Sequence, residues 1–258
     1  MIDVNVSLSR WPLRRLVGDE PQELVSQLRK RSVTQAWAGT FDGVLHKDLG
    51  SANERLASDC RRHGDGMLVP FGSVNPRLPD WQEDVRRCQE LYHMPGIRLH
   101  PNYHDYGLDD PVFGELLHAA TARRMIVQIA VSMEDERTQH RLMRVPDVDI
   151  ARLAERIQNE PEARVVVLNF NPLHELEMAR KLTATGRVYF DTSMVESVGG
   201  VARLARETSV RQVVFGSHYP LFYFESALLK VREGGFTEAD ARAVLEENAR
   251  RLLGAWRT

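Results

Sequence analysis

Eight short β-rich runs, separated by stretches with helical periodicity, limit what this chain of 258 residues can fold into. The runs are IDVNVSL (2–8), TQAWAGTF (34–41), MLVPFGSV (67–74), GIRLHP (96–101), MIVQIAV (125–131), RVVVLNF (164–170), RVYFDTS (187–193) and RQVVFGS (211–217). The last helical stretch, residues 237–254, has Thr237 as a plausible N-cap, and we expect it to end at Gly254. This regular alternation is typical of a parallel sheet with crossover helices.

The number of runs and the chain length both match the (β/α)8 TIM barrel. The alternative is a doubly wound open sheet, but no glycine-rich dinucleotide loop follows the first run, and no shift in composition suggests a second domain. We therefore predict an α/β fold, a (β/α)8 TIM barrel formed by a single domain over residues 1–258. In such a barrel the functional side chains lie at the carboxyl ends of the strands.

Composition narrows the classes of partner. The 34 Lys and Arg residues nearly balance the 36 Asp and Glu residues, so no basic field exists to attract nucleic acid. Cys60 and Cys88 lie far apart in charged helical stretches, and we expect both to be free thiols. The sequence contains neither a signal-peptide pattern nor an apolar run long enough to span a bilayer, which predicts a cytoplasmic protein without a membrane partner.

Several motifs at the strand ends resemble a known family. They are GIRLHPNY with the DDPVF that follows it, VVLNFNP, VYFDTS, FGSHYP and the terminal ENARRLLG. Together they resemble the amidohydrolase-related family, the amidohydrolase 2 type of the metal-dependent hydrolase superfamily, over nearly the whole chain. The resemblance implies a TIM barrel whose site lies at the carboxyl ends of the strands.

The resemblance also implies where metal ligands would stand. Metal-using relatives have two histidines on the first strand, one on each of the fifth and sixth, and an aspartate after Gly-Ser on the eighth. The matching residues here are Asn5, Ser7, Ala130, Phe170 and His218, with Asn169 or Asn171 in place of Phe170 if the register differs by one. Amide and hydroxyl groups are weak neutral ligands, and alanine and phenylalanine donate nothing. We therefore expect a degenerate metal site, no tightly bound metal and no cofactor.

Polar residues remain at the predicted barrel mouth. The candidate substrate-binding residues are Asn5, Ser7, Arg98, His100, Gln128, Asn169 and Asp191. Arg98 either binds a substrate carboxylate or pairs with Asp3 or Asp191. Asn5 and Ser7 either contact a ligand or fill a polar core, and His100 either orients its loop or takes part in catalysis.

His218 is the candidate catalytic residue, a general base that needs an orienting partner such as Asp191, Ser193 or Glu196. The function predicted first is metal-independent hydrolysis of a small anionic ester or lactone. The alternative is a catalytically silent barrel that binds a small molecule or a protein partner, and a homo-oligomer is left open. Residues 132–149, which follow the fifth run, are expected to form an active-site loop or lid.

Overall fold

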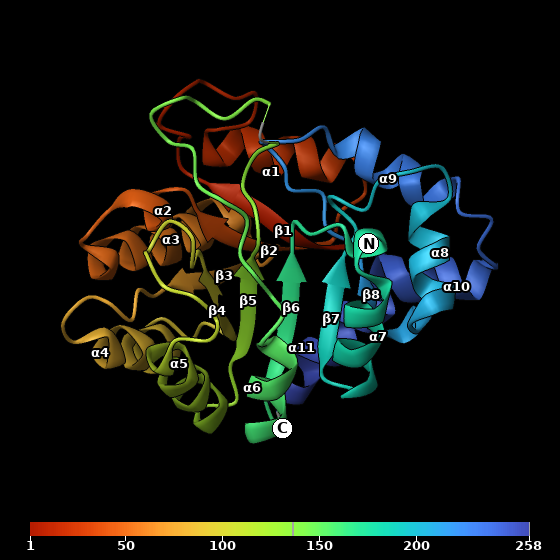
Figure 1. The fold of residues 1–258 in the computed structure, drawn as a ribbon. Helices are drawn as coiled ribbons and strands as arrows, with labels where there is room; N and C mark the ends of the chain where they lie inside the picture. The colour runs from red at the N-terminus through yellow and green to blue at the C-terminus, as the bar shows by residue number, and fades with distance from the viewer. Residues whose placement is uncertain (136, 258) are drawn as a thin grey trace.

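A computed structural model describes residues 1–135 and 137–257, and its eight strands form one parallel sheet in sequential order. The strands are β1 (Ile2–Leu8), β2 (Gln35–Thr40), β3 (Leu68–Ser73), β4 (Gly96–Leu99), β5 (Ile126–Ala130), β6 (Arg164–Leu168), β7 (Val188–Asp191) and β8 (Val213–Val214). The sheet closes beside β1, where the N–H of Val4 donates to the carbonyl of Phe215 at 2.9 Å and that of Ser7 to the carbonyl of Tyr219 at 3.0 Å. The predicted (β/α)8 barrel is confirmed (Figure 1).

Helices surround the barrel (Figure 1). They are α1 (Pro21–Lys30), α2 (Asp42–Leu45), α3 (Leu49–Gly64), α4 (Trp81–Arg86), α5 (Pro111–Ala122), α6 (Leu153–Asn159), α7 (Leu176–Ala184), α8 (Gly200–Glu207), α9 (Phe224–Arg232), α10 (Glu238–Arg242) and α11 (Asn248–Arg257). Among the described residues, no helix has both the length and the apolar character that crossing a bilayer requires.

Two predicted boundaries differ from the structure. Thr237 does cap α10, with its hydroxyl accepting from the N–H of Asp240 at 3.1 Å, but the prediction that the last helix ends at Gly254 is wrong. One glycine costs a helix only about 1 kcal/mol, so α11 continues through it to Arg257. The eighth strand is shorter than predicted at both ends: residues 210–212 form a 3-10 turn, and residues 215–217 lie outside the strand.

A polar layer lies inside the barrel between two apolar layers. Three successive inward residues of β5 mark the layers: Ile126 at the bottom, Gln128 in the middle and Ala130 at the mouth. At the bottom the rings of Trp37 and Phe71 stack 4.9 Å apart. At the top lies a group that we call the mouth cluster, consisting of Trp11, Phe41, Val44, Ala130, Met133 and Leu221. The barrel axis is therefore closed above its polar groups.

Candidate functional site

Arg98 extends from β4 into the polar layer and is 2% exposed. Its guanidinium has five N–H groups, and each has an acceptor. The acceptors are Oε1 of Gln128 at 2.8 Å, the carbonyls of Val6 at 2.9 Å, Trp37 at 3.1 Å and Val4 at 3.4 Å, and Oγ of Ser7 at 3.3 Å. Backbone carbonyls therefore hold this cation where the sequence predicted Asp3, Asp191 or a substrate carboxylate, and no donor of Arg98 remains for a ligand.

The surroundings of Arg98 are built to fit its side chain. A Cβ at Gly39 would lie 2.7 Å from Nη1 of Arg98, so only glycine leaves room there. Gln128 is fixed as well, because its Nε2 donates to the carbonyl of Val4 at 2.7 Å. Burial lowers the pKa of Arg98 to about 10, which still leaves it charged at neutral pH.

Asn5, Asn169 and Asp191 form a second network in the polar layer. Nδ2 of Asn5 donates to Oδ1 of Asn169 at 2.7 Å and to Oδ2 of Asp191 at 2.8 Å. Oγ of Ser193 donates toward Oδ1 of Asp191 at 3.0 Å, and burial raises the pKa of this carboxyl. Asn169, directly after β6, is thus the residue that meets Asn5. Phe170, which the sequence placed in that position, instead stacks on Phe190 with ring centroids 6.0 Å apart.

Asp3 is fully buried beside the end of the eighth strand. Its Oδ1 accepts from the N–H groups of Asn5 and Ser217, both at 3.0 Å, and its Oδ2 accepts from Oγ of Ser217 at 2.5 Å. Burial outweighs these hydrogen bonds and raises the pKa of Asp3 to about 7. The carboxyl therefore links β1 to the residues after β8, and burial favours its protonated form.

His218, the predicted base, is 1% exposed. Its Nε2 donates to the carbonyl of Met133 at 2.8 Å, so its orienting partner is this backbone group and not Asp191, Ser193 or Glu196. Burial lowers the pKa of His218 to about 4, well below the value that suits a base at neutral pH. Its backbone has a φ of 57°, an uncommon left-handed conformation for histidine. The neutral ring therefore presents Nδ1 as an acceptor, and within the described part of the chain that atom has no partner.

His100 lies next to a further buried histidine. It is 2% exposed, and its ring packs edge-on against His104 with centroids 5.9 Å apart. Burial lowers the pKa of His100 well below its ordinary value, and the positive charge of Arg98 acts in the same direction. Among the described residues, Nδ1 of His100 and Nδ1 of His104 have no hydrogen-bond partner. Nε2 of His104 donates to the carbonyl of Gly43 at 3.0 Å, so Nδ1 of His104 is an acceptor, and the lowered pKa values keep both rings neutral.

At the positions that the family resemblance assigns to metal ligands, the structure shows few groups that could bind a divalent metal. Nδ2 of Asn5 is directed at Asn169 and Asp191, Ala130 offers a methyl group, and Ser7 contacts the guanidinium of Arg98. This fixed positive charge would repel a second cation. Across residues 1–135 and 137–257, no three His, Cys, Asp or Glu side chains are grouped so that they could hold a metal ion. That the isolated protein has no tightly bound metal stays a prediction.

Residues 132–149, which we call the mouth loop, cross the carboxyl ends of the strands; Glu136 lies outside the described residues. Figure 1 shows this green loop beside the red loop that follows β1. Arg14 of the red loop pairs with the buried carboxylate of Glu134, and Nδ2 of Asn102 donates to the carbonyl of Pro146 at 3.0 Å. Together with the bond from His218 to Met133, these contacts hold the mouth loop over the barrel axis.

Removing the Arg14 side chain should loosen the mouth loop. In Arg14→Ala the carboxylate of Glu134, which is 3% exposed, loses its ion pair. Because water can hydrate this buried charge only when the loop opens, the open state is favoured. We expect acylation of His218 by diethylpyrocarbonate to become about fivefold faster, because the rate follows the open population. Peptide mapping by mass spectrometry measures it, with exposed His118 as internal reference. Arg15→Ala, which removes a neighbouring arginine paired with Asp19, is the control, and equal rates in both variants would contradict the expectation.

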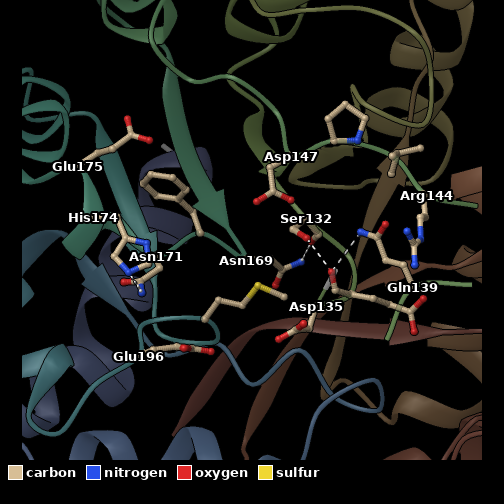
Figure 2. A pocket seen from close by; sticks show the side chains of 15 residues that line it. Ser132, Asp135, Gln139, Arg144, Asp147, Asn169, Asn171, His174, Glu175 and Glu196 are labelled. Atoms are coloured by element: carbon tan, nitrogen blue, oxygen red, sulfur yellow. Dashed lines mark hydrogen bonds between the residues drawn. The ribbon is translucent and has the colours of Figure 1, made fainter. Parts of the chain in front are cut away.

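A cavity of about 690 Å³ opens beside the barrel axis, at the carboxyl ends of β5, β6 and β7 (Figure 2). We call it the side cavity, and its lining includes Asp135, Asp147, Asn169, Phe170, Glu175 and Glu196. Of the predicted substrate-binding residues, Asn169 is the one in this lining. Asp135 also lines a second cavity of about 250 Å³, which reaches Ser217 and Tyr223. The mouth loop thus separates two cavities.

The sequence predictions missed most of the groups that close the barrel axis. Met133 contributes its backbone carbonyl, and Trp11 and Leu221 contribute apolar packing. None of these residues has a reactive or charged side chain that would mark it in the sequence. Only the length of the mouth loop indicated a cover over the site. The side cavity was missed as well, because its residues come from loops after three different strands.

Solved structures share this fold. The 2,6-dihydroxybenzoate decarboxylase from Rhizobium superposes with a TM-score of 0.77 at 12% identity, covering 98% of this chain and 99% of that chain. The dihydroxybenzoic acid decarboxylase from Polaromonas sp. JS666, solved with manganese, superposes with a TM-score of 0.74 at 11% identity. The match covers 99% of this chain and 98% of that chain. A probable 2-pyrone-4,6-dicarboxylic acid hydrolase from Acinetobacter baumannii gives 0.69 at 14%, covering 98% of each chain. At such low identity the likeness establishes the fold alone.

The sequence itself was compared with families and with individual proteins. We found no match to it among the curated proteins. The model of the amidohydrolase family matches residues 14–255, from the loop after β1 to the last turn of α11. This chain therefore belongs to the amidohydrolase family.

Proposed function

We propose that this chain is a ligand-binding member of its family that does not perform metal-dependent chemistry, and that its ligand is a small molecule in the side cavity. This is the silent-barrel alternative that the sequence left open. The observation that carries it is the saturation of Arg98, whose five N–H groups all bond to the protein. An active site needs such donors free for substrate or for charge that develops in the transition state.

The other polar side chains along the barrel axis support the same proposal. Asn5 and Gln128 donate to protein acceptors, and Nε2 of His218 is bonded beneath the mouth cluster. The side cavity, in contrast, is open and large enough for a small molecule, since ligand pockets typically measure about 300–1,000 Å³. Its place at the carboxyl ends of three strands is where barrels of this type bind ligands.

We expect no turnover above the uncatalysed rate for 2,6-dihydroxybenzoate, p-nitrophenyl acetate or γ-butyrolactone, with or without added Mn²⁺. The reason is that the groups at the barrel axis are already bonded to the protein. Chromatographic detection of product tests this. Turnover that scales with protein concentration and vanishes in His218→Ala, with the fold retained by circular dichroism, would overturn the proposal.

Ligand binding in the side cavity has its own test. A small-molecule library is screened for compounds that raise the melting temperature of the protein. In Met194→Trp, which places an indole in the side cavity, the shift should disappear. Leu142→Trp adds the same group at a residue of the mouth loop that is 82% exposed, and the shift should persist there. Binding that survives Met194→Trp would place the ligand elsewhere.

Hydrolysis with His218 as base is the second candidate. The unpartnered Nδ1 of this buried histidine favours it, because an orphaned acceptor in the interior is uncommon. It requires the mouth loop to open, because His218 is buried and lines neither cavity. Esterase activity that appears in Arg14→Ala and not in Arg15→Ala would support this candidate.

A further inference from the structure

We infer that the side cavity takes an organic cation with an extended hydrocarbon part, such as a linear polyamine. This inference rests on the proposed function, since it names the ligand class of that same cavity. It differs from the anionic substrate that the sequence led us to expect. The inference rests on three features of the side cavity, namely its size, the charge of its lining and its apolar wall.

The charge of the lining favours a cation. Carboxylates enter from separate segments: Asp135 and Asp147 from the mouth loop, Glu175 before α7, and Glu196 after β7. Asp135 is neutralised by Arg137, and a fifth lining carboxylate, Glu134, is neutralised by Arg14, but within residues 1–135 and 137–257 the other three form no ion pair. Arg144 is the one arginine among the lining residues. A bound cation would relieve this repulsion, and an anion would increase it.

The distribution of the carboxylates favours a long ligand over a compact ion. Figure 2 shows Glu175 on one side of the cavity and Asp147 toward the other, with Glu196 and Asp135 below them. No grouping among the described residues suits a metal ion, although the cavity holds about 690 Å³. A chain with cationic groups at both ends matches such divided charge.

The wall between the charges is partly apolar. Phe170 lines the cavity and is held in place by stacking on Phe190, so its ring is a fixed surface. Met194 contributes a flexible thioether to the same lining. Aromatic faces attract ammonium groups, and hydrocarbon chains pack on both side chains. These residues would contact the methylene segments of a polyamine.

Isothermal titration calorimetry with spermidine at low ionic strength tests the inference. Spermidine should bind, and its Kd should rise with added salt. The double variant Glu175→Gln/Glu196→Gln should weaken binding about tenfold. The matched control, Glu155→Gln/Glu177→Gln, removes two exposed carboxylates outside the lining and should change Kd less than about twofold. Equal weakening by both double variants would mean diffuse attraction to the surface and would overturn the inference.

Two comparison ligands separate this inference from the proposed function. Citrate is anionic, and 1,8-octanediol has a chain of similar length to spermidine without charge. If either binds in a manner sensitive to Met194→Trp and spermidine does not, the cationic class is wrong and the ligand-binding function stands. If neither these three compounds nor any library compound binds in that manner, the proposed function fails as well.

Discussion

Arg98→Met should lower the free energy of unfolding by about 3–5 kcal/mol, the range for breaking a buried charged network. The substitution removes all five donors and leaves their acceptors in the interior. Three of these acceptors are backbone carbonyls, which cannot turn toward water without bending β1 or β2. The carbonyl of Val4 keeps its bond from Gln128, and those of Val6 and Trp37 lose their bonds from Arg98. Each unsatisfied buried group costs about 1–3 kcal/mol. Urea unfolding at neutral pH measures the loss.

Two further variants test the geometric reason for this loss. Arg98→Lys keeps the charge but offers three donors in a different geometry, so an intermediate loss is expected. Arg152→Met removes an exposed arginine paired with Glu155 and should change stability by less than about 0.5 kcal/mol. If Arg98→Lys were as stable as the parent, the stabilisation by Arg98 would come from its charge and not from its five donors.

Asp3→Asn should remove a large pH dependence of stability. Because burial raises the pKa of Asp3 from 3.8 to about 7, the folded chain holds a proton that the unfolded chain has lost between these values. The stabilisation from this proton is fully present below 3.8 and is lost as the pH rises through 7. Relative to Asp3→Asn, the parent should lose up to about 1.4 kcal/mol per pH unit in this window, about 4 kcal/mol in total.

Urea unfolding of the parent and of Asp3→Asn from pH 3 to pH 9 measures this difference. Asparagine fits the site, because its Oδ1 can still accept from the N–H groups of Asn5 and Ser217. Asp105→Asn, which changes an exposed carboxylate in the same way, is the control for the substitution itself. A constant difference between parent and Asp3→Asn across the window would show that Asp3 titrates as an ordinary carboxyl.

Much of the fold follows from local patterns in the sequence. The run IDVNVSL forms β1 with the predicted bounds, because apolar residues for both faces lie within seven positions. Strict alternation fails inside this strand, where the register against β2 shifts between Asp3 and Val6, and no residue type marks that irregularity. The extent of β8 was also not predictable, since it depends on how the chain returns to β1 through the bridge from Val6 to Tyr219.

The sequence predicted which residues lie in the site, but it did not predict their hydrogen-bond partners. Asn5 and Arg98 are buried inside the barrel, as strand periodicity indicates, and His218 is buried after β8, at the position that the family resemblance implied. Their partners are a carbonyl of the mouth loop for His218 and carbonyls of β1 and β2 for Arg98, and every residue type carries such a group. Sequence reasoning assigns side chains to each other and therefore expected carboxylates in these places.

The saturated guanidinium also bears on how this barrel could be redesigned. Arg98 binds groups from β1, β2 and β5 at once, and Gly39 is fixed by its side chain. A histidine introduced at position 5 or 7 would meet that cation before it met a metal. The cation cannot be removed first without orphaning its acceptors. Single substitutions toward a metal site are therefore expected to be unstable, and their effects are not additive. A metal-binding variant would need all the substitutions to be introduced together.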